Sequence, residues 1–243
     1  MVKLQGAIIA AGRGERLRDS VPGIPKPLVE IGGEPMLARQ ARALLDSGAE
    51  SVIAVVNSET ARLIEERRLA MPPALSLIVR DTANSMESLF AIGERLAPGL
   101  FILATVDAMI PQSEIARFKT AAIARIEPDR PGRADGALGV TKWRGDKRPL
   151  FAEVTGAGSI ARLGADNSPL VTAGIYLLPS KIFELTAAAR RLGLGAMREF
   201  LALLLERGLV LAGIEIADAI DVDEAADLAA ARRAIKDHRS GEQ

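Results

Sequence analysis

The sequence predicts an α/β protein built from βαβ units around a mostly parallel sheet. Short apolar runs of strand length alternate with longer amphipathic stretches of helical periodicity, which is typical of that architecture. The chain has 243 residues, of which 49% are hydrophobic, so it is long enough to bury a core without disulfide bonds. We therefore expect a single domain over residues 1–237, followed by a disordered polar tail over 238–243.

The expected elements of the first half follow from the spacing of apolar residues. Residues 6–11 form a continuous apolar run, as expected of a central strand that is buried on both faces. A short strand over 28–31 and a helix over 36–46 come next, with Gly48 placed to end the helix. The remaining expected strands are 51–56, 75–79 and 100–105, and the remaining expected helices are 59–69, 85–96 and 112–126.

The second half begins after an exposed loop over 127–133, which is rich in Pro, Asp and Gly. Strands dominate at first, and helices alternate with them toward the end of the chain. The expected strands are 136–141, 150–155, 159–163, 171–177 and 209–216, and the expected helices are 180–191, 196–207 and 223–236.

Composition excludes several classes of protein. The 31 basic residues balance the 31 acidic ones, which argues against a nucleic-acid or anionic membrane partner. The absence of cysteine excludes a disulfide framework and cysteine-ligated zinc or iron–sulfur clusters. No apolar run approaches the roughly 20 residues that span a bilayer, and none resembles a secretion signal. We therefore expect a cytoplasmic protein.

The most informative stretch is the Gly-rich loop after the first strand. It reads Ala10-Ala11-Gly12-Arg13-Gly14-Glu15-Arg16-Leu17-Arg18 and is followed by Pro25-Lys26-Pro27-Leu28. A strand that breaks into such a turn offers backbone N–H groups to phosphate oxygens, and the loop's basic side chains add positive charge. Leu17 replaces the third glycine of a dinucleotide fingerprint, and no Walker loop is present. The alternative interpretation is an ordinary turn with solvated charges.

These two segments resemble the N-terminal motif of the NTP-transferase family, the nucleotidyltransferases that include sugar-1-phosphate and phosphocholine enzymes. The resemblance implies a Rossmann-like three-layer α/β/α fold with a mixed, mostly parallel sheet. It places a nucleotide-binding part at about 1–126 and an acceptor-binding part at about 134–216. It also implies catalytic roles for Arg16 and Lys26, and nucleotide binding by Ala10, Ala11, Gly12, Arg13 and Gly14.

Two aspartates are candidate ligands for Mg²⁺, which the resemblance implies as a cofactor. Asp107 follows the buried strand 100–105, at the edge where ligands bind in open α/β sheets. Asp223 lies in a segment similar to the family's C-terminal Asp-x-Asp-Thr-Pro-Glu-Asp-Leu stretch, although residues 224–226 depart from it. Asp221 is the alternative ligand, and a further alternative is that Asp223 only caps the last helix.

Base and acceptor sites follow from weaker resemblances. Asn84 and Ser88 match the Asn…Ser-Leu pattern of phosphocholine cytidylyltransferase-like enzymes, which makes CTP the preferred nucleotide and UTP the second choice. Asn84 is equally explained as the N-cap of the helix that follows. Gly174 and Tyr176 resemble the strand that borders the acceptor in the family. Candidates for the acceptor phosphate, each also explicable as a surface charge, are Lys142, Lys147 and Arg162.

The function expected from these observations is a Mg²⁺-dependent transfer of a nucleotide from an NTP to a small phosphorylated or phosphonate acceptor. An acceptor phosphate is already anionic at pH 7, so no strong base is needed, in keeping with a single histidine, His238, in the polar tail. The alternatives are a sugar-1-phosphate uridylyl- or guanylyltransferase, a non-catalytic nucleotide-sensing domain, and a NAD-dependent oxidoreductase. The sequence does not predict an oligomeric state.

Overall fold

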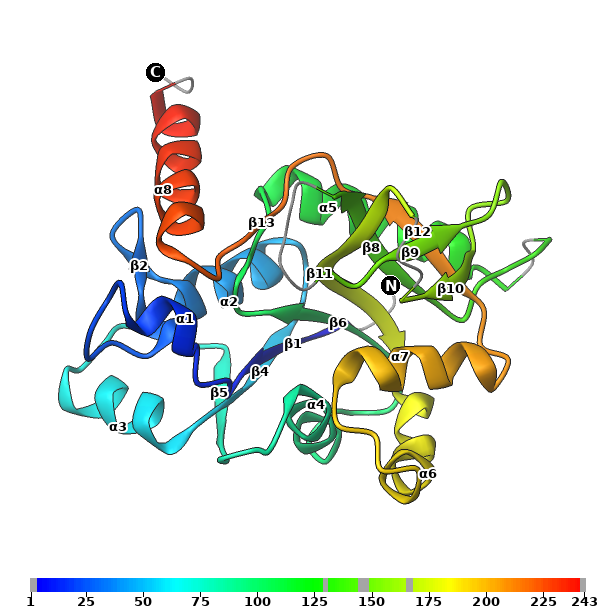
Figure 1. Ribbon diagram of the computed structural model, residues 1–243, viewed down its shortest axis with the longest axis horizontal. Coiled ribbons are helices and arrows are strands. Elements are labelled where there is room, and N and C mark those ends of the chain that lie inside the picture. Colours follow the sequence, from blue (N-terminus) through cyan, green and yellow to red (C-terminus); the bar gives the residue numbers. More distant parts are fainter. Residues whose placement is uncertain (1–3, 129–130, 144–148, 165–167, 241–243) are drawn as a thin grey trace.

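A seven-stranded sheet lies at the centre of the computed structural model, which describes residues 4–128, 131–143, 149–164 and 168–240, the last five as backbone only (Figure 1). The strand order is β12-β8-β11-β6-β1-β4-β5. The bounds are β1 Gln5–Ala10, β4 Ser51–Val56, β5 Leu75–Val79, β6 Leu100–Thr105, β8 Gly136–Lys142, β11 Leu170–Pro179 and β12 Leu211–Glu215. β11 runs antiparallel to both its neighbours, whereas the other neighbouring pairs are parallel. The predicted mixed, mostly parallel sheet is therefore confirmed.

Helices cover both faces of the sheet, and each face has its own apolar core. α2 (Met36–Asp46) and α5 (Gln112–Ile126) supply one core, whereas α4 (Ser85–Gly93) and α7 (Met197–Glu206) supply the other. Figure 1 shows the two groups on opposite sides of the sheet. The expected three layers are thus present, because each amphipathic helix buries one apolar face against the sheet.

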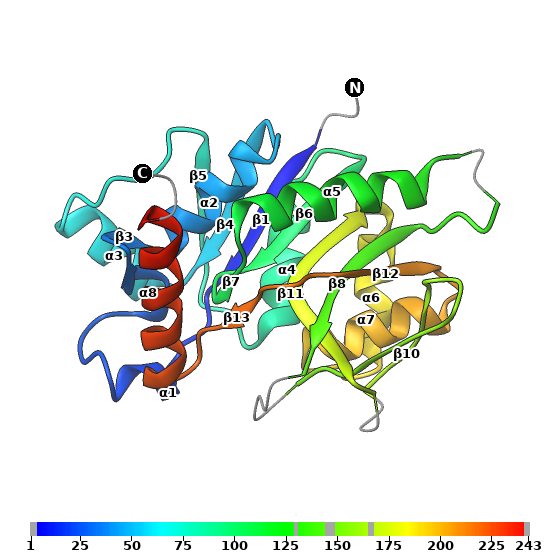
Figure 2. The same cartoon turned by 90° about the horizontal axis from the view of Figure 1, so that it is seen from above.

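The remaining helices flank these layers. α8 stands beside α1 and β2, as both views show (Figures 1 and 2), and Arg232 of α8 donates to the carbonyl oxygen of Glu30. The bounds are α1 Glu15–Arg18, α3 Ser58–Glu66, α6 Thr186–Arg191 and α8 Ala225–Ser240, with 3₁₀ helices at Lys26–Leu28 and Ser180–Leu185. No described helix has both the length and the apolar composition needed to cross a membrane.

Three pairs of short strands complete the fold. One pair joins segments that are distant in sequence, and the other two lie within single connections between larger elements. They are β2 (Glu30–Ile31) with β3 (Glu34–Pro35), β7 (Ala108–Met109) with β13 (Ile220–Asp221), and β9 (Ala152–Val154) with β10 (Ile160–Leu163). The β7–β13 pair brings the end of β6 and the start of α8 together.

Apart from end shifts of a few residues and the unpredicted short elements α1, β3, β7 and β13, three departures from the predicted elements concern this description. The strand expected over 28–31 is shortened to Glu30–Ile31, because Lys26–Leu28 forms a 3₁₀ turn and Pro27 has no N–H for a strand ladder. The helix expected over 180–191 is a 3₁₀ helix followed by α6. The helix expected over 223–236 is α8, whose backbone extends to Ser240; residues 241–243 lie outside the described residues, and the disordered tail expected over 238–243 stays a prediction.

Candidate active site

The Gly-rich loop leaves the carboxyl end of β1, which lies between β6 and β4 in the sheet. Leu17 is buried beneath it and its N–H donates to Gly14, so the loop is folded back onto the protein. Within the part of the chain that the structure describes, the backbone N–H groups of Gly12, Arg13 and Gly14 have no acceptor. Such a run of free amides at the end of a buried strand suits phosphate oxygens.

Lys26 lies between two carboxylates that come from opposite halves of the chain. Its Nζ is 2.5 Å from Asp107 Oδ2 and 2.7 Å from Asp223 Oδ1. Asp223 also forms an ion pair with Arg16, whose Nη2 lies 2.6 Å from Asp223 Oδ2. The predicted catalytic cations, Arg16 and Lys26, thus form one cluster with the predicted metal ligands, Asp107 and Asp223. The Lys26 side chain is buried in this cluster, with 8% of its surface exposed.

The ion pairs in this cluster control its protonation. Burial by itself would lower the pKa of Lys26, but the charges and hydrogen bonds of Asp107 and Asp223 raise the pKa above its ordinary value. Burial would likewise raise the pKa of Asp107, but the charge of Lys26 and hydrogen bonds from Lys26 and Thr105 hold the pKa below its ordinary value. Lys26 and Asp107 are therefore both charged at neutral pH.

The β7–β13 pair explains how the two carboxylates meet. Asp221 is paired with Ala108 in the short ladder, and the N–H of Val222 donates to the carbonyl oxygen of Asp107. Single carboxylate oxygens of Asp107, Asp221 and Asp223 consequently lie within 4.8 Å of one another. Both residues left open above as the second ligand, Asp221 and Asp223, therefore lie beside Asp107.

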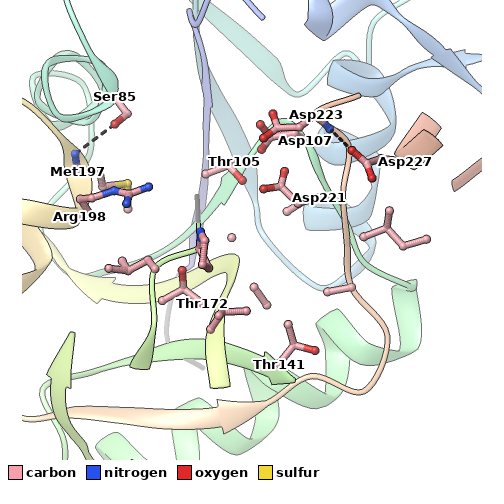
Figure 3. A pocket seen from close by; sticks show the side chains of 18 of the residues that line it. Ser85, Thr105, Asp107, Thr141, Thr172, Met197, Arg198, Asp221, Asp223 and Asp227 are labelled. Carbon is pink, nitrogen blue, oxygen red and sulfur yellow. Dashed lines mark hydrogen bonds between the residues drawn. The ribbon is translucent and has the colours of Figure 1, made fainter. Parts of the chain in front are cut away.

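Asp227 takes over the capping role that was the alternative for Asp223. Its Oδ2 accepts from the N–H groups of Asp223 and Glu224, at 3.1 and 2.8 Å (Figure 3). This bonding satisfies amides at the start of α8. The side chain of Asp223 is left to bind Lys26 and Arg16.

The donor set of the cluster fits Mg²⁺. Mg²⁺ prefers oxygen ligands and is usually held by one or two protein carboxylates together with substrate phosphates and water. The three aspartates supply oxygen atoms alone, and no histidine or cysteine joins them among the described residues. Asp107, Asp221 and Asp223 are the residues that would hold the ion.

A cavity of about 590 Å³ opens beside the carboxylates (Figure 3). Predicted residues that line it are Arg16, Asp107, Gly174, Tyr176 and Asp223. Gly174 has a φ of 73° at an irregularity in the β11–β8 register, and a Cβ there would lie 2.6 Å from Thr105 Oγ1. A side chain at this position would therefore clash with the end of β6, beside Asp107.

Tyr176, two residues after Gly174 on β11, also lines this cavity. Burial raises its pKa to about 12, even though a hydrogen bond with Thr172 acts in the opposite direction. The phenol is therefore neutral throughout the physiological range and acts as a hydrogen-bonding group.

Sequence reasoning missed several residues of this cavity. They include Ser85, whose hydroxyl accepts from the N–H of Met197 at 3.1 Å, together with Thr141, Thr172 and Arg198. Of the cations predicted for the acceptor phosphate, Lys142 lines the cavity and Lys147 lies outside the described residues. Arg162 is on β10, pairs with Glu153 at 3.3 Å, and is not a lining residue.

A second cavity, of about 530 Å³, lies on the other side of the loop and is lined by Ala11, Arg13, Arg18, Asn57, Glu59, Asp81, Thr82 and Ala83. Asn84 is the N-cap of α4, and its Oδ1 accepts from the N–H of Glu87 at 3.0 Å. Ser88 is 1% exposed and its Oγ lies 2.6 Å from the hydroxyl of Thr82. Neither predicted base-site residue lines this cavity, but both adjoin the segment that does.

This geometry defines a class of protein. Its members have a three-layer α/β/α fold, and one edge of the sheet carries a carboxylate cluster and a loop with unbonded backbone amides. The sequence profile of the MobA-like NTP transferase domain matches residues 6–173, more than half of the chain. The chain belongs to this family, which confirms the resemblance drawn from the loop motif.

Curated relatives are similar over limited stretches. Mannose-1-phosphate guanyltransferase of Saccharomyces cerevisiae is 37% identical over 62 residues, which are 26% of this chain and 17% of the relative. The 2-aminoethylphosphonate cytidylyltransferase of Lancefieldella rimae is 27% identical over 172 residues, covering 68% of this chain and 63% of the relative. The match thus spans less than two thirds of either relative.

Solved structures share the fold over nearly the whole chain. The inositol-1-phosphate CTP transferase from T. maritima has a TM-score of 0.73 at 17% identity, covering 93% of this chain and 92% of that one. The CTP:phosphocholine cytidylyltransferase from Streptococcus pneumoniae has a TM-score of 0.70 at 15% identity, covering 96% and 100%. At these identities the likeness establishes the fold.

Proposed function

We propose that the protein is a Mg²⁺-dependent nucleotidyltransferase that joins an NTP, preferably CTP, to a small phosphorylated or phosphonate acceptor and releases pyrophosphate. The observation that carries this proposal is the position of Lys26 between Asp107 and Asp223. Asp107 and Asp223, the two candidate metal ligands, line the larger cavity, and Lys26 is the buried cation that contacts both of them. Family membership supports the same reaction class.

The two cavities suggest how the substrates are arranged. The loop separates them, since Ala11 and Arg13 line the smaller cavity and Arg16 lines the larger one. An NTP lying across the loop would put its base in the smaller cavity and its phosphates on the free amides. The α-phosphorus would then face the larger cavity, where Gly174 and Tyr176 border the space for an acceptor.

The reaction needs positioning and charge rather than a base. An oxygen of the acceptor phosphate forms a bond to the α-phosphorus, the bond from that phosphorus to its bridging oxygen breaks, and pyrophosphate leaves with the electron pair. Mg²⁺, when bound, neutralises phosphate oxygens. Lys26 and Arg16 hold positive charge next to the same oxygens and orient them. No residue has to remove a proton, because the acceptor is already anionic.

The preference for CTP is supported by names among the relatives and structural neighbours, which include enzymes that act with CTP. The guanyltransferases support the alternative, a sugar-1-phosphate guanylyl- or uridylyltransferase. A nucleotide-sensing domain is disfavoured because Arg16, Lys26, Asp107 and Asp223 are all present and in contact. A cytoplasmic location, without nucleic-acid or membrane partners, stays a prediction.

Pyrophosphate release is the test of this function. The purified protein is assayed with CTP, UTP, GTP and ATP, each against phosphocholine, 2-aminoethylphosphonate, inositol 1-phosphate and mannose 1-phosphate, with and without Mg²⁺. We expect turnover with CTP that disappears on chelation. Asp107→Asn should lower kcat on the order of 10²-fold or more through loss of a metal ligand. Glu66→Gln, which changes an exposed carboxylate on α3, serves as the matched control.

The outcomes separate the alternatives. Turnover restricted to GTP or UTP with a sugar phosphate would favour the second function. Nucleotide-induced thermal stabilisation without pyrophosphate from any pair would identify a sensing domain. Equal turnover by wild type and Asp107→Asn would contradict the proposed role of the carboxylate cluster.

A further inference from the structure

Gln40 is a buried polar residue that connects helix α2 to the turn carrying Asp107. It is 3% exposed and lies on the face of α2 that packs against the sheet. Its Nε2 donates to the carbonyl oxygen of Thr105 at 3.2 Å and also to that of Ala108. These two residues flank Asp107 on either side, so one amide group holds both ends of the turn.

The bonded carbonyls lie where regular pairing is interrupted. Thr105 is the last residue of β6, and Ala108 begins the short strand β7. Between them the chain turns, with the N–H of Val106 donating to Ile9 and the carbonyl of Asp107 accepting from Val222. Gln40 therefore fixes the turn from the side of α2, while β1 and the segment after β13 fix it from other directions.

A primary amide suits this position for two reasons. One nitrogen carries two N–H groups, so it can satisfy two buried carbonyl oxygens whose loss of partners would be unfavourable. The amide is also neutral, so it adds no charge behind the carboxylates. An apolar residue of the same size would fill the space but leave both carbonyls unpaired.

We propose that Gln40 is a positioning residue for the metal site: it holds the β6–β7 turn so that the carboxylate of Asp107 faces Lys26, Asp221 and Asp223. This inference rests on the proposed function, in which Asp107 is a metal ligand. Outer partners of this kind orient ligands and influence metal affinity without touching the metal. Gln40 itself contacts neither substrate nor metal.

The test uses the whole chain and Mn²⁺ as the probe ion, with free Mn²⁺ measured by electron paramagnetic resonance. Gln40→Met should weaken Mn²⁺ binding by about tenfold or more, in the range seen for such partners. Hydrogen exchange at the amides of residues 106–108 should accelerate. Ser47→Ala is the matched control, because Ser47, the C-cap of α2, is also 3% exposed and donates to a carbonyl, that of Leu44, away from the turn.

Each result decides the matter. Unchanged Mn²⁺ affinity in Gln40→Met, or an equal loss in Ser47→Ala, would overturn the positioning role and leave the proposed function intact. Absence of Mn²⁺ binding by the wild type would overturn the metal site and this inference together. If Gln40→Met does not fold, Gln40→Asn keeps a neutral amide but shortens the side chain by one methylene, so it cannot reach both carbonyl oxygens and should show the same loss of affinity.

Discussion

Gly14 packs so closely against Lys26 that a Cβ on Gly14 would lie 2.5 Å from the Cβ of Lys26. Gly14 also has a φ of 59°, a conformation that disfavours residues with a Cβ. Gly14→Ala should therefore lower the free energy of unfolding by at least about 1–2 kcal/mol and displace the Lys26 stem. Turnover, measured as pyrophosphate release, should fall at least tenfold. Thermal denaturation of the same variant measures the loss of stability.

Gly12→Ala is the matched control for this prediction. No atom lies within 4 Å of a Cβ placed on Gly12, so the variant should fold as stably as the wild type. If the loop binds phosphate, the added methyl group should instead raise the KM for the NTP. Equal stability of the two variants would contradict the packing argument.

Removal of the Lys26 ammonium should make folding more dependent on metal. Lys26→Met leaves Asp107 and Asp223 without their buried cation, which should reduce the free energy of unfolding by about 1–3 kcal/mol, below the value for fully buried pairs. Mg²⁺ should restore part of this loss, so the difference in Tm between Mg²⁺ and chelator should exceed that of the wild type.

The same substitution at Lys181 provides the comparison. Lys181 Nζ lies 2.7 Å from Asp135 Oδ1, but its side chain is half exposed, and Lys181 follows the end of β11 that pairs with the start of β6, whereas Asp107 follows the end of β6. Exposed ion pairs contribute little to the free energy of unfolding. Lys181→Met should therefore lower it only slightly, by an amount that is the same in Mg²⁺ and in chelator. A Mg²⁺ response as large as that of Lys26→Met would mean that the ion acts elsewhere.

The regular elements and part of the site could be predicted because they have strong local signals. The apolar run before Asp107 predicts both a buried strand and a carboxylate at its carboxyl edge, and the structure has β6 at those bounds. The helix 36–46 was predicted with the bounds of α2. Periodicity, however, does not reveal two-residue strands, so the β7–β13 pair that unites Asp107 with Asp221 had no signal.

Individual side-chain roles were harder to predict, since they depend on tertiary packing. Gln40 and Arg198 look like ordinary polar residues of amphipathic helices, yet one binds the Asp107 turn and the other lines the larger cavity. Ser88 is a predicted base-site residue, and in the structure its side chain is buried and hydrogen-bonded with Thr82; its role at the base stays a prediction. The burial of Lys26 could not be predicted either. Lys is rarely buried without partners, and its partners Asp107 and Asp223 are distant from it in the sequence.

Glu114 should make stability depend on pH below about 4.5. Hydrogen bonds from Arg117 and from the N–H of Ala217 lower its pKa to about 2. As pH falls, the unfolded chain therefore takes up a proton before the folded chain does, and the contribution of Glu114 is lost between about pH 4.5 and 2. The free-energy difference between wild type and Glu114→Gln should be largest above pH 5 and shrink toward pH 2.

The position of Glu114 links this effect to the site. Ala217 lies in the segment between β12 and β13 that leads to Asp221 and Asp223. Glu114→Gln should therefore also weaken Mn²⁺ binding modestly at pH 7, whereas Glu66→Gln, on the exposed face of α3, should not. Urea denaturation across pH and Mn²⁺ titration measure the two effects, and a constant free-energy difference from pH 6 to pH 3 would contradict the assignment.

Tyr176 offers a direct optical measurement, because it is the single tyrosine of the chain. Burial raises its pKa to about 12 in the folded protein, compared with about 10 when exposed. The unfolded chain therefore loses the phenolic proton first, and stability should fall as pH rises from about 10 to 12. Absorbance at 295 nm should rise near pH 10 in denaturant but only near pH 12, or together with unfolding, in its absence.

The control for this measurement is Tyr176→Phe, which should abolish the absorbance change and remove this alkaline loss of stability. If the phenol of the folded wild type instead titrates at pH 10, it is open to water, which would contradict its burial.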